Sequence, residues 1–368
     1  MSIHPIHSLF DNLYDLVVET AEGVRPPERL TVSEAAEKYR KLNNPGAYVG
    51  DWQNEMAPYL AEVMDELASN VFTGLVFVGP AQCGKTDIFL NWQTYSVVCD
   101  PADMMLIQTS NTTARDFSIR RVDRLHRHSE EVAKRLIQRR DADNTFDKQY
   151  SSGMMVSLSW PTINELSGKP IPRLWLTDYD RMDQDIDGEG SPFDLAKKRA
   201  TTFGSHGMCA AESSPGFTVE NPKWMPKTKH EAPPTKGILS LYNRGDKRRW
   251  YWRCVNCKNT FEPDFNLLRY PDSRDFMEAA EMVTMQCPHC EIDYSHEPSG
   301  GMPGKYEMNT MGRWVKDGLF WMPDGSMEGK GYRSDIASFW LKGAAAAFAS
   351  WKTLVFNYIT AEREYENT

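Results

Sequence analysis

The chain has 368 residues, of which 40% are hydrophobic and 25% charged, the balance of an ordinary globular protein of about two or three domains. Lys and Arg total 42 against 51 Asp and Glu, and the resulting net charge of −9 argues against a protein that simply coats DNA. It leaves room for a nucleic-acid enzyme with a local basic surface. No apolar run approaches the roughly 18–20 residues of a membrane span, and the first residues do not resemble a secretory signal.

The first 220 residues alternate between helical and strand patterns. Thr31 and Glu34 form a capping box that predicts a short helix. Apolar spacing and β-branched runs predict the elements that follow: helices at 32–41, 54–69, 86–95 and 113–140, the last broken near 128–129, and strands at 71–79, 104–108, 154–160, 173–177 and 208–212. Strands separated by helices indicate an α/β fold with a mostly parallel sheet flanked by helices.

The segment from Gly79 to Thr86 matches the phosphate-loop pattern G-x4-G-K-[ST], directly after a predicted strand and at the start of a helix. Gly79 and Gly84 permit a tight turn in which backbone N–H groups point at a phosphate, and the helix N-terminus adds partial positive charge. We expect Lys85 to reach the β- and γ-phosphates of ATP and the Thr86 hydroxyl to bind Mg²⁺.

A phosphate-loop ATPase also needs a strand that ends in acids, to hold Mg²⁺ and to orient the attacking water. The apolar strand 173–177 leads into Asp178 and Asp180, but the usual consecutive Asp-Glu is replaced by Thr177-Asp178. In one register Asp178 faces the metal, which we favour because a carboxylate suits a hard cation. In the other, Thr177 takes that position and Asp178 is the base. The sequence does not decide whether Asp178 or Asp180 is the catalytic base.

Polar residues at two other strand ends, 108–111 and 212–215, are candidate γ-phosphate sensors, although ordinary turns would look alike. Arg199 is a candidate catalytic arginine acting on a neighbouring subunit. Arg120 and Arg121 are alternatives for that role, and each of these arginines could equally form surface ion pairs.

Four of the seven cysteines form two CxxC pairs, Cys254 with Cys257 and Cys287 with Cys290, with 29 residues between the pairs. Two converging hairpin tips of this kind predict a tetrahedral Zn²⁺ site of the zinc-ribbon type. Four sulfur ligands leave no open position, so the metal would be structural. His289 is expected to be a bystander.

The composition changes near residue 220, which predicts four parts: an N-terminal helical segment (1–44), a phosphate-loop core (45–220), a linker with the zinc-ribbon-like element (221–300) and a C-terminal extension (301–368) ending in a helix at 343–364. Cations alternate with aromatic residues at 244–253, and lysines lie upstream. This pattern is typical of a nucleic-acid contact, and a hairpin with a buried aromatic face would show the same pattern.

Taken in order, these residues resemble the large terminase subunits of tailed bacteriophages, in the lambda-like GpA branch. The likeness runs over roughly 45–345 and rests on the segment 45–50, the loop 79–87 with Gln82 at a position where the family often has Gln, the segment 166–203, and Ser213-Ser214-Pro215 at the place of its coupling motif. In the literal family register, Asp178 falls on the family's Glu.

The resemblance implies an ATPase that uses ATP and Mg²⁺ to translocate double-stranded viral DNA into a procapsid. It also implies a homo-oligomeric ring on the portal, a small terminase subunit as partner, and the host cytoplasm as location. Family members carry a nuclease after the ATPase, and no matching acidic cluster follows residue 340, so we expect that part to be absent here.

The main alternative is a helicase-type nucleic-acid translocase with a structural zinc, but no DExH or DEAD string is present. A transport-type ATP switch and a zinc-stabilised DNA-binding protein without hydrolysis are the other classes considered.

Overall fold

The computed structural model describes residues 28–44, 48–139, 142–221 and 223–366, together with Leu13 and Val17. Most of the expected segment 1–44, residues 45–47 of the family-like segment, and the last residue of the expected helix 113–140 lie outside the described residues.

One large sheet organises the chain, and its inner strands are parallel. This confirms the predicted mixed α/β fold. The strand order is β10 (Thr260–Phe261), β9 (Arg248–Arg253), β17 (Ile336–Trp340), β3 (Gly74–Val78), β8 (Met208–Ser213), β7 (Arg173–Leu176), β4 (Met104–Ile107), β6 (Met155–Ser159) and β5 (Asp147–Gln149), with β14 (Arg313–Val315) also paired to β9. β5, β10 and β14 are antiparallel to their neighbours.

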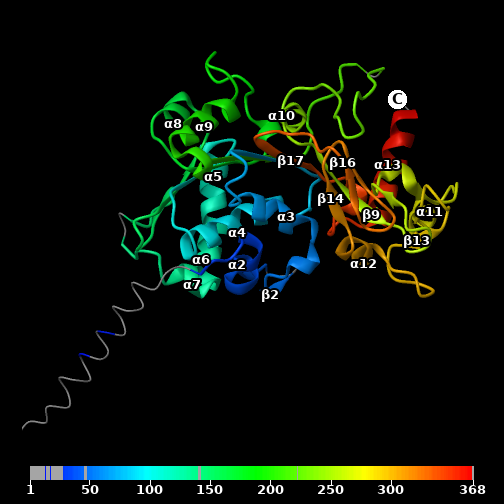
Figure 1. Cartoon of the computed structure of the whole chain (residues 1–368), viewed down its shortest axis with the longest axis horizontal. Coiled ribbons are helices and arrows are strands. Elements are labelled where there is room, and N and C mark those ends of the chain that lie inside the picture. The colour runs from blue at the N-terminus through cyan, green and yellow to red at the C-terminus, as the bar shows by residue number, and fades with distance from the viewer. Residues whose placement is uncertain are drawn as a thin grey trace, which may run out of the picture.

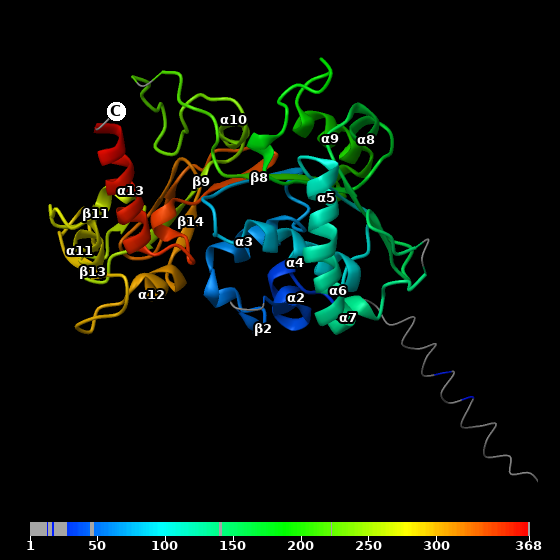
Figure 2. The same ribbon diagram turned by 180° about the vertical axis from the view of Figure 1, so that it is seen from behind.

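Helices cover both faces of the sheet (Figures 1 and 2). One face, which includes Phe77 and Trp175, packs on α4 (Lys85–Val98) and its neighbours α2 (Val32–Tyr39), α3 (Tyr59–Glu66), α5 (Asn111–Phe117), α6 (Asp123–His128) and α7 (Glu130–Ala133). The other face, which includes Val78 and Leu176, packs on α8 (Ile163–Ser167), α9 (Pro192–Ala200) and α10 (Ile238–Arg244). Successive residues of a strand point to opposite faces, so each strand contributes to both cores.

Three predicted helices are shorter than their patterns indicate. The expected helix at 54–69 is a 3-10 turn, η1 (Asn54–Met56), followed by α3, because Pro58 disfavours helical geometry at the preceding residue. The expected helix at 113–140 passes through a π-helical turn, η2 (Ser118–Val122), breaks at the extended Ser129, and ends with α7. The last helix, α13 (Trp351–Glu366), begins after the turn η6 (Gly343–Ala345).

Four strands of the central sheet, β9, β10, β14 and β17, come from beyond residue 220. β17 lies parallel to β3 on one side and to β9 on the other, while β8 pairs with the second edge of β3. The strand that precedes the predicted phosphate loop therefore lies between two strands that are far from it in sequence. The interpretation of 244–253 as a nucleic-acid contact is wrong for most of its residues. Arg248, Trp250 and Trp252 are at most 4% exposed, because β9 is an interior strand covered on both faces.

The remainder forms a smaller unit beside β9 (Figure 1). It contains a three-stranded sheet of β11 (Leu268–Arg269), β12 (Thr284–Gln286) and β13 (Asp293–Ser295), the helices α11 (Phe276–Glu281) and α12 (Lys305–Thr310), and the hairpin β15 (Leu319–Trp321) with β16 (Met327–Gly329). A further two-stranded sheet pairs β1 (Lys41–Asn43) with β2 (Val49–Asp51).

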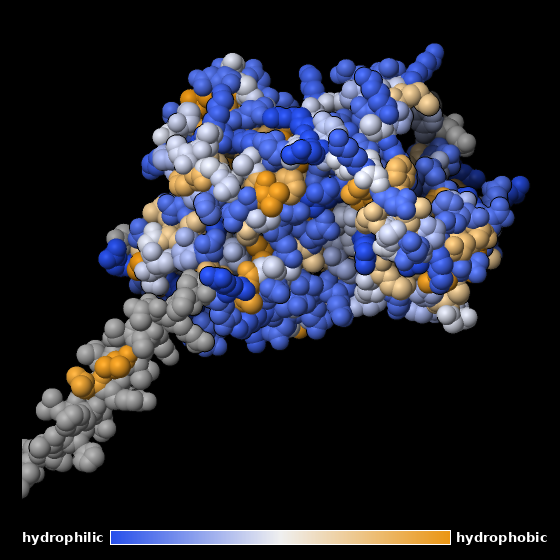
Figure 3. Space-filling model, viewed as in Figure 1, coloured by the Kyte–Doolittle hydropathy of each residue, from blue (hydrophilic) through white to orange (hydrophobic). Residues whose placement is uncertain are grey.

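Apolar side chains lie scattered among polar ones on the face shown in Figure 3. Within the described residues, none of the helices has both the length and the apolar character that crossing a membrane requires.

Candidate nucleotide site and cysteine cluster

The loop between β3 and α4 is a tight turn that depends on glycine. Gly84 has φ +92°, and a Cβ there would lie 2.6 Å from Cδ1 of Leu60. A Cβ on Gly79 would lie 2.7 Å from the Cys83 sulfur. Gln82 adopts the left-handed region at φ +60°. Larger side chains at the two glycines would therefore displace the loop from helix α3 or from its own turn.

Lys85 is held by the loop that it follows. Its Nζ donates to the carbonyl oxygens of Gly79 (3.2 Å) and Pro80 (2.7 Å) and to Oγ of Ser214 (3.1 Å). Ser214 in turn donates to the Gly79 carbonyl at 2.9 Å. Thr86 is the second residue of α4, so its hydroxyl lies at the N-terminal end of that helix. The ammonium group is thus placed at the loop and its charge is solvated by protein oxygens.

Helix α3 supports the loop from behind. The Tyr59 hydroxyl donates to the Cys83 carbonyl (3.1 Å) and accepts from the Ala347 N–H (3.0 Å), while the Trp314 indole donates to the Tyr59 carbonyl (2.8 Å). Burial raises the pKa of the Cys83 thiol to about 12, so this cysteine is a packing residue rather than a reactive one. One tyrosine therefore connects the loop with Trp314 of β14 and with Ala347 near the C-terminal helix α13.

The two candidate acids after β7 have different surroundings. Asp180 accepts backbone N–H groups from Gly216 (2.8 Å) and Ile238 (2.5 Å), one on each carboxylate oxygen. Asp178 is half-buried in the left-handed region at φ +53°, and none of the hydrogen bonds among the described residues reaches its carboxylate. Asp180 therefore joins the segment after β8 to the start of α10. The Asp178 carboxylate is free to accept a ligand.

Glu212, at the end of β8, is the acid that sequence reasoning noticed only as part of a polar strand end. Its Oε1 accepts the Thr177 hydroxyl and, at 3.3 Å, the Asp178 N–H. Burial raises the pKa of Glu212 to about 7, although the nearby Lys85 ammonium acts in the opposite direction. A buried acid at the end of a run of small apolar residues was the available signal.

The candidate arginines lie elsewhere. Arg199 is 7% exposed on α9, and its Nε donates to the Lys169 carbonyl while Nη1 approaches the Met105 sulfur. Its bonds are therefore to its own chain, away from the loop. Arg120 and Arg121 are exposed on η2, where Arg120 pairs with Asp116.

The four paired cysteines converge on one point. All four sulfurs lie within 4.8 Å of one another, with Cys254 and Cys290 at 3.6 Å and Cys257 and Cys287 at 3.9 Å. Sulfurs bound to one zinc at about 2.3 Å are separated by about 3.8 Å in a tetrahedron, whereas a disulfide requires about 2.05 Å. The spacing therefore fits four ligands of one ion.

The two CxxC turns repeat the same backbone geometry. The first joins β9 to β10 and the second joins β12 to β13. Lys258 and Glu291, each four residues after the first cysteine of its pair, are left-handed at φ +65° and +60°, and each N–H bonds back to that cysteine's carbonyl at 3.0 Å. The Tyr294 hydroxyl donates to the Cys254 sulfur at 3.1 Å, and His289 contacts the Thr260 carbonyl instead of the cluster.

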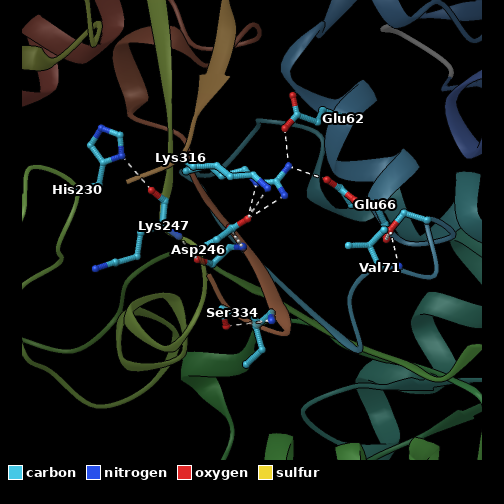
Figure 4. Close-up of polar contacts among 12 residues, drawn as sticks. Glu62, Glu66, Val71, His230, Asp246, Lys247, Lys316 and Ser334 are labelled. Atoms are coloured by element: carbon cyan, nitrogen blue, oxygen red, sulfur yellow. Dashed lines mark hydrogen bonds and ion pairs between the residues drawn. The ribbon is translucent and has the colours of Figure 1, made fainter. Parts of the chain in front are cut away.

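A buried charge network lies between the loop region and the cysteine region. Arg248, on β9, is 1% exposed and pairs with Glu66 at 2.8 Å and Asp246 at 2.9 Å, and also with Glu62. Figure 4 shows Glu62 and Glu66 approaching from α3, while Asp246 faces Lys316 at 3.4 Å. The network joins the helix behind the loop to the strand that leads into the first CxxC turn.

Together, the parallel sheet, the glycine-dependent loop and the acids at the strand ends define an α/β protein with a candidate nucleotide site at the carboxyl edge of its sheet. The family model for the ATPase domain of the phage terminase large subunit gpA matches residues 46–314. The chain belongs to this family, as its resemblance indicates.

Two known proteins are similar to the chain. The large terminase subunit of Enterobacteria phage P21 is 21% identical over 350 residues, which cover 92% of this chain and 51% of that protein. The chain therefore spans about half the length of this curated relative. The crystal structure of the HK97 bacteriophage large terminase matches with a TM-score of 0.38 at 12% identity, over 50% of this chain and 36% of that one.

Proposed function

We propose that this chain is the ATP-hydrolysing motor part of a phage DNA-packaging enzyme. The observation that carries the proposal is the loop 79–86, placed between a buried parallel strand and a helix, in a chain of the terminase ATPase family. Phosphates would bind the N–H groups of this loop, with Gly79, Gln82 and Gly84 shaping it. Lys85 would exchange its present carbonyl partners for phosphate oxygens.

Mg²⁺ would be held at the same edge by Thr86 and Asp178, where it would neutralise charge on the β- and γ-phosphates. In hydrolysis, a water oxygen bonds to the γ-phosphorus as the bond to the ADP oxygen breaks, and a carboxylate accepts the water proton. Asp178 is better suited to that edge than Asp180, because both oxygens of Asp180 already accept backbone N–H groups.

We further propose that Cys254, Cys257, Cys287 and Cys290 bind a structural Zn²⁺. The near-tetrahedral sulfur spacing and the repeated turn geometry support this ligand set. The metal would fix the hairpin at the end of β9 to the hairpin of β12 and β13, and it would take no part in hydrolysis.

Family membership supports double-stranded DNA as the substrate that is moved, and a homo-oligomeric ring, a small terminase subunit and the portal of the procapsid as partners, in the host cytoplasm. An arginine from a neighbouring subunit would complete the site. Arg199 serves this role only if its contact with Lys169 opens, whereas Arg120 is already exposed.

The test compares ATP binding and DNA-stimulated hydrolysis by the wild-type chain, Lys85→Ala and the control Lys198→Ala, which changes an exposed lysine on α9. Lys85→Ala should abolish hydrolysis and weaken ATP binding, while the control retains both. Because a missing neighbour can lower hydrolysis, binding is measured as well. ATP binding that Lys85→Ala leaves unchanged would overturn the proposal.

A further inference from the structure

The strand expected to bring an acid to the metal side of the nucleotide ends in a hydroxyl. Leu176 of β7 pairs with Ala211 of β8, so the next residues, Thr177 and Glu212, lie side by side. Glu212 also pairs with Phe77 of β3, two residues before the loop begins. In this register, Thr177 after β7 offers a hydroxyl where a carboxylate was expected. The neighbouring strand β8, which pairs with β3, supplies a carboxylate, that of Glu212, at the same level.

Glu212 is on the face of the sheet that carries α4. Residues paired across parallel strands point to the same face, and Phe77 belongs to the core that contains Phe89 and Trp92 of α4. Trp175, two residues before Thr177, packs against Phe89 with ring centroids 6.1 Å apart. The Glu212 carboxylate therefore lies beneath the helix whose first residues are Lys85 and Thr86.

Only one of the two Glu212 oxygens is used within the described chain. Oε1 accepts from Thr177 and from the Asp178 N–H, but Oε2 is buried and has no hydrogen-bond partner among the described residues. The residue is 2% exposed. Buried carboxylate oxygens without partners are rare in native proteins because they lose water and gain nothing in return. An acceptor of this kind beside Lys85 is suited to a ligand that arrives with the nucleotide.

We infer that Glu212 is the metal-side carboxylate of this site, with Oε2 accepting a hydrogen bond from a water ligand of the nucleotide's Mg²⁺ and Thr177 fixing Oε1. Asp178 is then free to accept the proton of the attacking water. The inference rests on the proposed function and replaces Asp178 at the metal by Glu212. When bound, Mg²⁺ supplies neutralising charge to the phosphates.

The test measures how much Mg²⁺ tightens nucleotide binding. The dissociation constant of a fluorescent ATP analogue is determined in Mg²⁺ and in EDTA for wild type, Glu212→Gln and the matched control Glu220→Gln, an exposed residue in the following loop. Loss of an outer partner of a metal ligand typically weakens metal affinity by about 10–100-fold. Glu212→Gln should therefore lose most of the Mg²⁺ enhancement, bind normally in EDTA, and regain the enhancement when Thr177→Asp is added.

Thermal unfolding of each variant shows whether it is folded. Thr177→Val is a milder second variant, because it removes only the hydroxyl that donates to Oε1 of Glu212. It should lower the Mg²⁺ enhancement of nucleotide binding by a few-fold. Enhancement that Glu212→Gln leaves intact, equal weakening in Mg²⁺ and EDTA, or a folded double variant without recovery would overturn the role of Glu212. Nucleotide binding that is absent from wild type, or insensitive to Lys85→Ala, would instead overturn the proposed function.

Discussion

The nucleotide edge and the cysteine cluster are both polar sites, but they differ in how their polar groups are satisfied. At the nucleotide edge, Lys85 is bonded to three oxygens of the protein and Asp180 to two backbone N–H groups. In the cluster, four sulfurs lie within 4.8 Å of one another, and two of the pairs are 3.6 and 3.9 Å apart.

The difference separates a loop whose lysine is already held by the protein from a cluster that, as proposed, is held together by a metal ion. The loop is one contiguous segment that Leu60 and Tyr59 of α3 support from one side. The CxxC turns come from different hairpins, and a metal ion would supply the attraction between them. Tyr59 links the loop to Ala347, and Arg248 links α3 to β9, the strand that leads into the first CxxC turn. Four predictions, from the largest expected effect to the smallest, test this contrast.

Removing the metal should have the largest effect. Chelation of zinc, or the double change Cys254→Ser and Cys287→Ser, should eliminate about one zinc per chain and lower the thermal midpoint by about 10 °C or more, because ligand binding by such sites is coupled to folding. Withdrawing nucleotide from a 100-fold excess over Kd should cost only about 2.7 kcal/mol. Metal analysis measures the zinc content and calorimetry measures the loss of stability, with Cys99→Ser as the control variant. A folded, metal-free wild type would contradict the contrast.

Arg248→Met should destabilise the chain by about 3–5 kcal/mol, because it removes a buried cation from Glu62 and Glu66 and leaves the buried Asp246 with Lys316 at 3.4 Å as its remaining cation. The measurement is the free energy of unfolding in urea. The control Arg244→Met removes the exposed pair with Asp194 and should cost about 0–1 kcal/mol. Equal losses in the two variants would show that the network does not hold α3 to β9.

Two buried histidines outside both sites are each bonded to a tyrosine, His126 with Tyr150 (2.8 Å) and His230 with Tyr251 of β9 (2.9 Å). Burial lowers the pKa of both imidazoles from 6.5 to about 4. Between these values the unfolded chain binds protons that the folded chain excludes, so stability is fully present above pH 6.5 and falls as the pH drops toward 4.

Each histidine should contribute about 1–3 kcal/mol to this loss. Urea unfolding at pH 7.5 and 4.5 measures the loss for wild type, His126→Gln and His230→Gln. Each variant should lose less stability than wild type between the two pH values. A pH dependence that neither variant changes would contradict the assignment of these two groups.

Tyr59→Phe should have the smallest effect, about 1–2 kcal/mol, because it removes one hydroxyl that joins the Cys83 carbonyl to the Ala347 N–H. Thermal and urea unfolding measure the change. In the control Tyr48→Phe, the lost hydrogen bond goes to the more exposed Asp51 carbonyl, and little change is expected. A Tyr59→Phe chain as stable as the control would show that this bridge between the loop and Ala347 adds no stability.

The sequence by itself predicted what depends on short segments. The loop 79–86, the inner strands and the two CxxC turns each follow from residues close together in the chain, since turn geometry and alternation of side chains are local properties. The capping box at Thr31 and Glu34 forms as predicted. Asp178, Asp180 and Glu212 lie just after or at the ends of strands as the sequence predicted, but their contacts were not predictable.

Tertiary structure decided what depends on neighbours distant in sequence. β17 joins the sheet beside β3 and β9 joins it beside β17, and the basic, aromatic β9 is buried because side chains on both faces and a charge network cover it. Glu212 meets Thr177 because β8 lies next to β7, a pairing that strand patterns leave undetermined. The types of chemical group were readable from local sequence, whereas which groups share a site was set by the order of strands in the sheet.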